Sequence, residues 1–191
     1  MSDTLSTIDL DRIRLSDQRF CISPFSETRG QGGLVPEGHP ALVPVLKPEN
    51  NDYIPVIGGA WLRHIQRAGQ TCIQAIVLDD RTSDCSCLCR AVAFKSMMRP
   101  LLISELIRSV FLLRAHHDTD WMAGHSSQLF NQAFTPTYLD QILAVSGLGD
   151  PALCLIHSNR LSFKAARMLC TMEAGQRELI LSVFERIKLS T

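Results

Sequence analysis

The sequence contains no uninterrupted apolar run that approaches the roughly 18 residues of a membrane-spanning helix. Its first residues, Met1-Ser2-Asp3-Thr4, carry an acid where a signal peptide carries Lys or Arg. Internal repeats, low-complexity tracts and a basic tail are also missing. We therefore expect neither a membrane-spanning protein nor an exported one.

An excess of charge of either sign is absent as well, because 19 Lys and Arg balance 19 Asp and Glu. No global field therefore draws the protein onto nucleic acid or a membrane. Lysine is scarce, since four lysines stand against 15 arginines. Because the planar guanidinium fork matches phosphate and carboxylate, we expect some of these arginines to act as ligands rather than as solubilising groups.

Apolar residues are abundant enough for a core: 46% of the 191 residues are hydrophobic and 20% are charged. This balance is typical of one compact globular domain, or of one with a smaller appendage. Seven cysteines, an odd number in a chain without an export signal, are expected to be thiols in a reducing compartment.

The first half of the sequence predicts short strands separated by turns. Alternating or β-branched stretches predict strands at 41–46, 53–57 and 72–78, and a strand or turn at 8–15. Residues 23–40 are rich in Gly, Pro and polar side chains and predict a long loop, and 47–52 predict a turn. A helix is expected from Trp61 to Ala68, closed by Gly69.

Beyond Ala91 the apolar residues recur with the period of a helix. Helices are predicted at about 100–115, 136–147, after Asp150, and at 161–171 and 176–188, where the last carries an apolar stripe of Leu179, Ile180, Val183, Phe184 and Ile187. The fold class predicted is α+β: a small mixed sheet with helices in residues 1–95, followed by an all-helical part in residues 96–191.

A double glycine, Gly58-Gly59, lies between a predicted strand and a predicted helix. Glycines at such a place let backbone amides approach an anion at the helix N-terminus, where the helix dipole is favourable. Arg63, one turn into the helix, could close over a phosphate. The more ordinary interpretation of a double glycine is a tight strand-to-helix turn.

The order of these segments resembles the ParB/sulfiredoxin superfamily over roughly residues 8–188. Tyr53-Ile54-Pro55-Val56-Ile57-Gly58-Gly59, the helix at 62–69 and the strand at 73–77 are similar to its N-terminal domain, which has a small sheet and a glycine-led nucleotide-binding helix. Lys95-Ser96-Met97-Met98-Arg99 stands where ParB proteins carry Glu-Asn-x-x-Arg, and the segments at 135–151 and 161–169 resemble the helical region that follows.

The resemblance implies a nucleotide-binding site and indicates which residues form it. It implies nucleotide binding by Gly58, Gly59, Arg63, His64 and Arg99, with Arg63 and Arg99 as catalytic residues, ATP as cofactor and Mg²⁺ as a candidate ion. No residue is assigned as a metal ligand. The acids Asp79, Asp80, Asp84, Asp118 and Asp120 could hold Mg²⁺, but solvated loop acids are the favoured interpretation.

Departures from the family pattern narrow the expected chemistry. Ala60 stands where sulfiredoxins have their cysteine, which argues against peroxiredoxin repair. Ala60 and Trp61 replace the paired arginines of ParB proteins, and Lys95 and Ser96 replace their Glu and Asn. A CTP-dependent sliding clamp uses those groups, so the partition mechanism is not expected to be retained.

Small plasmid proteins with a diverged ParB/sulfiredoxin fold include fertility-inhibition factors, and the sequence resembles this group. That resemblance implies ATPase and DNase activity in the bacterial cytoplasm, against the relaxase–DNA complex at the coupling protein of a type IV secretion channel, so that conjugative and T-DNA transfer is blocked. It also implies a place at, but not within, the inner membrane. Two other classes stay open: a partition or transcription protein that binds a specific DNA site, and a non-catalytic inhibitor that occupies a protein partner.

The predicted recognition helix at 136–146 contains no Arg or Lys. Bidentate reading of guanine needs such a residue, and docking on phosphates needs a positive face. We therefore expect DNA binding without strong sequence preference.

Cys85-Ser86-Cys87-Leu88-Cys89 is the densest group of cysteines. Alternation would place the three thiols on one face of an extended segment, where a soft metal could bind. The paired spacing of a structural zinc site is not evident, so a buried or loop cluster of thiols is the favoured interpretation.

Overall fold

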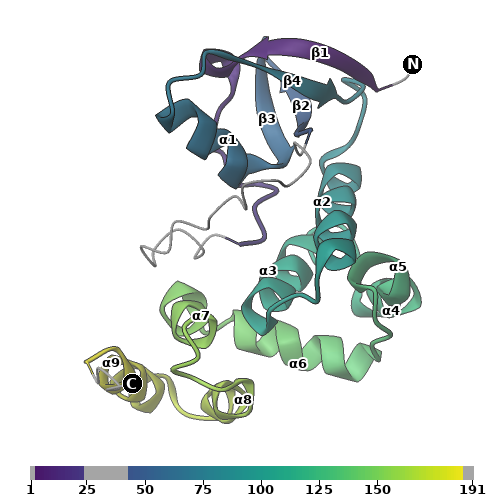
Figure 1. Cartoon of the computed structure of the whole chain (residues 1–191). Helices are drawn as coiled ribbons and strands as arrows, with labels where there is room; N and C mark the ends of the chain where they lie inside the picture. Colours follow the sequence, from purple (N-terminus) through teal and green to yellow (C-terminus); the bar gives the residue numbers. More distant parts are fainter. Residues whose placement is uncertain (1–2, 24–42, 187–191) are drawn as a thin grey trace. The chain divides into compact units, whose positions relative to one another are not determined.

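The computed structural model describes residues 3–23 and 43–186, and the chain divides into two compact units. Unit 1 is Met1–Phe94 and contains the sheet; unit 2 is Lys95–Thr191 and is helical (Figure 1). A small mixed sheet with helices, followed by helices alone, confirms the predicted α+β class. The predicted loop at 23–40 lies outside the described residues except for Ser23.

Four strands form the sheet of unit 1 in the order β1-β4-β2-β3. They are β1 (Thr4–Asp9), β2 (Val45–Glu49), β3 (Asp52–Ile57) and β4 (Cys72–Val77). β1 pairs with β4 and β2 with β3 in antiparallel fashion, whereas β2 and β4 are parallel. The first strand therefore begins before the predicted 8–15 segment and ends inside it at Asp9, where a short 3-10 helix, η1 (Leu10–Arg12), follows.

The turn predicted at 47–52 is shorter than expected, because β2 continues through Pro48 to Glu49. Asn50 and Asn51 alone make the turn, both with positive φ (53° and 67°), as the preferred two-residue hairpin turn requires. Pro48 is tolerated because β4 pairs only with Val45 and Leu46, so that this end of β2 has a neighbour on one side.

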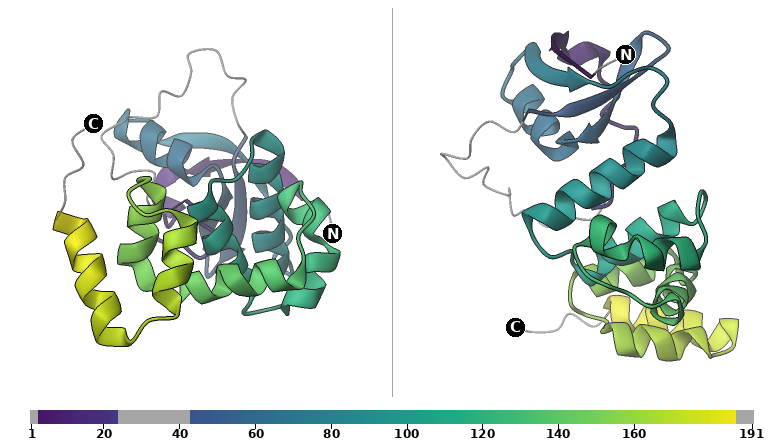
Figure 2. Two further views of the ribbon diagram at one scale, coloured as in Figure 1. Left: turned by 90° about the horizontal axis from the view of Figure 1, so that it is seen from below. Right: turned by 90° about the vertical axis from the view of Figure 1, so that its right-hand side faces the viewer.

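Helix α1 (Gly59–Arg67) covers one face of the sheet (Figures 1 and 2). Its Leu62 and Ile65 pack in a buried cluster with strand residues that include Ile8, Leu46 and Ile73. The helix closes as predicted at Gly69, whose φ is 81°. The amides of Gly69 and Gln70 donate to Gln66 and Ile65, which is the Schellman pattern.

Helix α2 (Asp84–Met98) contains the division between the units, after Phe94. The extended segment predicted for the cysteines at 85–89 is wrong, because these residues are helical. Cys85, Cys87 and Cys89 lie in its first turns and not in an extended segment. Each helical residue turns about 100°, so Cys85 and Cys89 share a face and Cys87 points elsewhere. The alternation failed as a strand signal because Asp84 and the preceding Ser83 start a helix, and the Ser83 hydroxyl accepts from the Ser86 amide.

Unit 2 consists of helices whose bounds are α3 (Ile103–Leu113), α4 (Thr119–Gly124), α5 (Ser126–Phe130), α6 (Pro136–Ser146), α7 (Gly149–His157), α8 (Phe163–Cys170) and α9 (Ala174–Arg186). Helix α6 packs against α3, α4 and α8, and α7 packs against α3, α8 and α9 (Figure 2). The buried faces of α6 and α7 carry aliphatic side chains, among them Leu139, Ile142 and Ile156. Helix α6 is therefore at the centre of the unit's packing.

The helices predicted after residue 100 are confirmed, and two short ones were missed. Thr135 caps α6 by accepting from the Tyr138 amide, and Pro136 is its first residue, as predicted. α4 and α5 span only six and five residues, too short for a periodic signal. The stripe predicted on α9 is only partly buried: Leu179 and Val183 are exposed, and Leu181 is buried instead. Ile187 lies outside the described residues.

Within the described ranges, the structure has no single helix long and apolar enough to cross a membrane. Helices α6 and α7 taken together have the length and apolar composition of a membrane span, but they are bent by 112° where they meet.

Candidate functional site

The predicted glycine turn is formed by Gly58, which follows β3 and caps α1. Its φ of 89° lies in the left-handed region, where an L side chain is strained. The Leu62 amide donates to the Gly58 carbonyl at 2.9 Å, while the amides before it belong to the first helical turn, which has no intrahelical acceptors. A glycine cap has no side chain to accept from them, so this end of α1 is suited to an anion.

Gly59 opens the helix beside the Arg63 side chain. A Cβ placed on Gly59 would lie 3.6 Å from the Pro55 Cβ and 4.0 Å from Arg63 Nη1, which is ordinary contact. The fold therefore tolerates a methyl group at Gly59, although that group would occupy space next to the guanidinium. Arg63 Nη1 itself donates to the Leu15 carbonyl at 3.2 Å.

His64 lies on the exposed side of α1, between the buried Leu62 and Ile65 positions. The structure thus brings Gly58, Gly59 and Arg63 together at one end of α1. His64 follows Arg63 by one residue and so points about 100° around the helix from it.

Arg99 lies in unit 2, where it holds a buried carboxylate. Its Nη1 and Nη2 donate to the two Glu105 oxygens at 2.8 and 2.7 Å, and Lys95 Nζ lies 3.0 Å from Oε1. The Leu102 amide also donates to Glu105, and only 2% of the Glu105 side chain is exposed. Glu105 is therefore satisfied by charge-assisted bonds from both basic residues of the 95–99 motif. A role for Arg99 at the nucleotide stays a prediction.

Ser96, the remaining polar residue of that motif, is buried and donates to the Leu129 carbonyl at 2.9 Å. The motif in this chain thus stabilises the beginning of unit 2.

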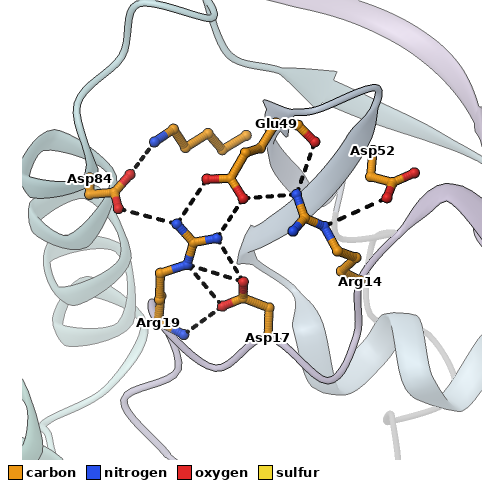
Figure 3. Close-up of polar contacts among 7 residues, drawn as sticks. Arg14, Asp17, Arg19, Glu49, Asp52 and Asp84 are labelled. Atoms are coloured by element: carbon orange, nitrogen blue, oxygen red, sulfur yellow. Dashed lines mark hydrogen bonds and ion pairs between the residues drawn. The ribbon is translucent and has the colours of Figure 1, made fainter.

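Sequence reasoning missed a network of ion pairs in unit 1, which Figure 3 shows. The ionic network consists of Arg14, Asp17, Arg19, Lys47, Glu49, Asp52 and Asp84. Arg19 is its centre, because its guanidinium contacts Asp17 at 2.8 Å, Glu49 at 2.7 Å and Asp84 at 3.4 Å. Lys47 also contacts Asp84. The network joins the segment after η1, the β2–β3 hairpin and the start of α2.

The network favours ionised carboxylates. Hydrogen bonds from Arg19, with a further contribution from Arg14, lower the pKa of Glu49 to about 2. The Arg19 side chain likewise lowers the pKa of Asp17. Some arginines were expected to bind phosphate or carboxylate groups, and in this network Arg14 and Arg19 bind carboxylates of the protein itself. The sequence held one signal of this network, the close spacing of Asp17 and Arg19. A search for strands and helices by apolar periodicity does not consider such pairs of charges.

The acids considered for Mg²⁺ mostly have intramolecular roles. Asp84 contacts Lys47 and Arg19, Asp118 caps α4 by accepting from the Trp121 amide at 2.7 Å, and Asp79 accepts from the Arg81 amide at 2.9 Å. Asp84 is therefore not the solvated loop acid that was expected, because it is the first residue of α2 and is paired with two basic side chains.

Two of the cysteines on α2, Cys87 and Cys89, have a raised pKa. Burial raises the pKa of Cys87, and burial together with the neighbouring Cys85 thiol raises that of Cys89 to about 11. Because the thiolate is the nucleophile, the raised pKa of Cys87 and Cys89 lowers the reactivity of these two thiols near neutral pH.

The exposed face of α6 carries Thr137, Asp140 and Ala144, between its buried Leu139, Ile142 and Val145 positions. This face offers no guanidinium or ammonium group to a guanine edge. A basic recognition surface is therefore absent from this helix, as its sequence predicts.

Comparison with known proteins gives distant structural similarities. No protein-family model and no curated protein matches the sequence. One similar solved structure is the C-terminally truncated chromosome-partitioning protein ParB from Caulobacter crescentus complexed to the centromeric parS site. It has a TM-score of 0.45 and 13% identity, with 93% of this chain and 92% of that chain covered. The same truncated protein complexed with CTP-gamma-S gives 0.34 and 12%, with 96% and 99% covered. At such identity no residue role is carried across.

Proposed function

We propose that the protein is a diverged member of the ParB/sulfiredoxin superfamily that acts as a fertility-inhibition factor. In this proposal it hydrolyses ATP and cleaves DNA, and it thereby blocks conjugative and T-DNA transfer through a type IV secretion channel. The order of sequence segments resembles this group, in particular its oncogenic suppression activity protein. The partners that follow from the resemblance are the relaxase–DNA complex and the coupling protein, met in the bacterial cytoplasm or at the inner membrane.

The observation that carries the proposal is the geometry at the start of α1. Gly58 has a left-handed backbone and no side chain, and the Arg63 guanidinium lies near Gly59. Backbone amides and a guanidinium at one helix N-terminus suit a phosphate group by charge and by hydrogen-bond direction. The residues present therefore fit one phosphate of a nucleotide.

ATP would supply the phosphoryl group that is cleaved. The protein's contribution is electrostatic: the amides of the α1 N-terminus orient a phosphate, and Arg63 neutralises the charge that grows on it in the transition state. A magnesium ion would be held chiefly by the phosphates, because Mg²⁺ in such sites commonly uses few protein ligands.

A second candidate function is inhibition by occupancy, without hydrolysis. It is favoured by Arg99 and Lys95, which hold Glu105 within unit 2. The third class, a site-specific partition or transcription protein, is disfavoured by the uncharged and acidic residues on the exposed face of α6.

Replacement of Arg63 separates the first two candidates. Arg63→Ala should lower the rate of ATP turnover by about 10²–10³, the usual cost of losing one preorganised donor. Arg63→Lys should restore only part of the rate, because an ammonium is a point charge without the planar fork. Turnover would be measured on purified protein with and without Mg²⁺, and transfer inhibition in donor cells that express each variant.

Arg67→Ala is the matched control, since Arg67 is an exposed arginine on the last turn of the same helix. It should keep both activities. If Arg63→Ala is folded and loses turnover but still blocks transfer as wild type does, the protein acts by occupying its partner. Equal turnover in wild type and Arg63→Ala would place the nucleotide elsewhere.

A further inference from the structure

Four aromatic side chains form a continuous aromatic row in unit 2: Phe130, Phe134, Tyr138 and Phe163. Successive ring centroids lie 5.5, 5.3 and 6.0 Å apart, and the row runs from the end of α5 across the start of α6 to the start of α8. The Phe134 and Tyr138 rings are stacked, at 27° to one another. The row therefore joins three elements at one edge of the unit's packing.

The row is not simply part of the core. Phe130 is buried, but Phe134, Tyr138 and Phe163 each keep part of their surface exposed. Tyr138 comes just after the cap of α6, so its ring lies beside the N-terminal turn of that helix. Partly exposed rings in succession offer faces and edges on which flat groups can stack.

A small cavity of about 120 Å³ lies at the Phe130 and Phe134 end of the row. Asn131 and Gln132 also line it, and both are exposed. The rest of its lining is mostly aliphatic, with Pro100, Leu101 and Leu106. An apolar lining with two aromatic rings and two amide groups suits a planar heterocycle that carries hydrogen-bond donors and acceptors, because Asn and Gln pair well with nucleobase edges.

Basic side chains stand at the other end of the row. Arg167 follows Phe163 by four residues and so lies on the same side of α8, and Lys164 is its neighbour at three residues' distance. Both are exposed, and α8 contains no acid. The nearest acid on α6, Asp140, lies two residues after Tyr138, about 200° around the helix.

We propose that this surface binds unpaired nucleotides of a single-stranded nucleic acid. Bases stack on Tyr138 and Phe163, one base enters the cavity beside Phe134, and phosphates contact Lys164 and Arg167. Single-strand binding proteins combine aromatic stacking with a basic track in this way. A duplex hides its base faces, so it cannot use the row. The inference deepens the proposed function, since it names the form of nucleic acid that the protein would act on.

The first test is equilibrium binding by fluorescence anisotropy, with labelled oligo(dT) of about 15 nucleotides, a typical single-strand site length, against a blunt duplex of equal length. The single strand should bind at least about fivefold more tightly, the gain expected from one stacked base. An oligo(U) of the same length shows whether the bound strand is DNA or RNA. Higher affinity for oligo(dT) identifies DNA as the ligand, and higher affinity for oligo(U) identifies RNA. Equal affinity for single strand and duplex overturns the proposal.

Variants then test the row and its basic end. Tyr138→Leu and Phe163→Leu keep apolar volume and remove a stacking face, and each should weaken single-strand binding by about five- to hundredfold. Phe111→Leu is the matched control, because Phe111 is an exposed ring on α3 outside the row. Arg167→Ala should reduce the salt slope by about one unit, whereas Arg81→Ala, an exposed arginine in unit 1, should not.

Photocross-linking needs no variant and covers the case in which a row variant unfolds. Wild-type protein irradiated with oligo(dT) that carries 5-iodouracil should yield cross-linked peptides that contain Phe134, Tyr138 or Phe163. Cross-links confined to other peptides overturn the proposal. ATP turnover without DNA separates the two proposals: Tyr138→Leu should retain it, so failure of the nucleotide site at Arg63 and failure of the aromatic row give different results.

Discussion

Gly58 and Gly59 look equivalent in the sequence but have different roles as residues. Gly58 needs its φ of 89°, so any L side chain there costs about 1–2 kcal/mol of left-handed strain. Gly59 has no such requirement and would accept a methyl group at ordinary contact distance. The fold therefore does not require glycine at this position, and the space that Gly59 leaves lies beside the Arg63 guanidinium.

Glu49 makes stability depend on pH. Its pKa is lowered in the folded state from 4.5 to about 2, so its contribution to stability is present above about 4.5 and is lost as pH falls toward 2. Asp17, whose pKa is also lowered by Arg19, acts in the same direction. In Glu49→Gln the melting temperature should therefore fall less steeply between pH 5 and 2 than in wild type, as thermal denaturation followed by circular dichroism would show.

Asp140→Asn is the control for that experiment, since it removes an exposed acid outside the ionic network. It should retain the wild-type pH dependence over this window. A wild-type slope in Glu49→Gln would mean that the ionic network does not govern acid unfolding.

Helix α6 is the element whose sequence and structure agree most fully. The Thr135 hydroxyl and Pro136 start it, its buried residues follow the helical period, and its exposed face lacks basic groups. Helix α2 shows the opposite case, because a cysteine alternation that suits a strand is overridden by a helix start at Asp84. The capping residues of α6 thus predicted a helix correctly, whereas the alternation of cysteines over five residues in α2 did not indicate the right element.

The face of α6 predicts that any duplex binding ignores sequence. Without a basic recognition helix, duplex binding rests on phosphate contacts from dispersed arginines, and these contacts weaken steeply as salt rises. In competition assays a candidate plasmid site and random duplex should bind within a few-fold of each other. A preference of about a thousandfold, which is in the range of specific binders, would restore the partition or transcription interpretation.

At the scale of the whole molecule, all seven cysteines are free thiols, distributed over both units. Cys72 and Cys154 are exposed, whereas Cys87 is buried. Burial raises the pKa of Cys87, Cys89 and Cys170, which lowers the thiolate fraction on which reaction depends.

Thiol titration with a chromogenic disulfide reagent checks this distribution. Native protein at pH 8 should show a fast phase from Cys72 and Cys154 and slow phases from the rest, which accelerate as pH rises because more thiolate forms. Cys72→Ser and Cys154→Ser should each remove one equivalent from the fast phase. In denaturant without reductant all seven thiols should react, and a smaller number would contradict the free-thiol state.

The sequence by itself determined the elements that depend on neighbouring residues: the strand before Gly58, the closure of α1 at Gly69, the cap at Thr135 and the α+β order. Such features are local, because capping, glycine conformation and periodicity act within a few residues. Only tertiary structure decided what distant side chains do. Arg19 meets Glu49 and Asp84 across 30 and 65 residues. Tyr138 meets Phe163, 25 residues later, because α6 packs on α8. A one-dimensional pattern records which residues are charged or aromatic, but their partners are chosen by packing, which brings together groups that the chain itself keeps far apart.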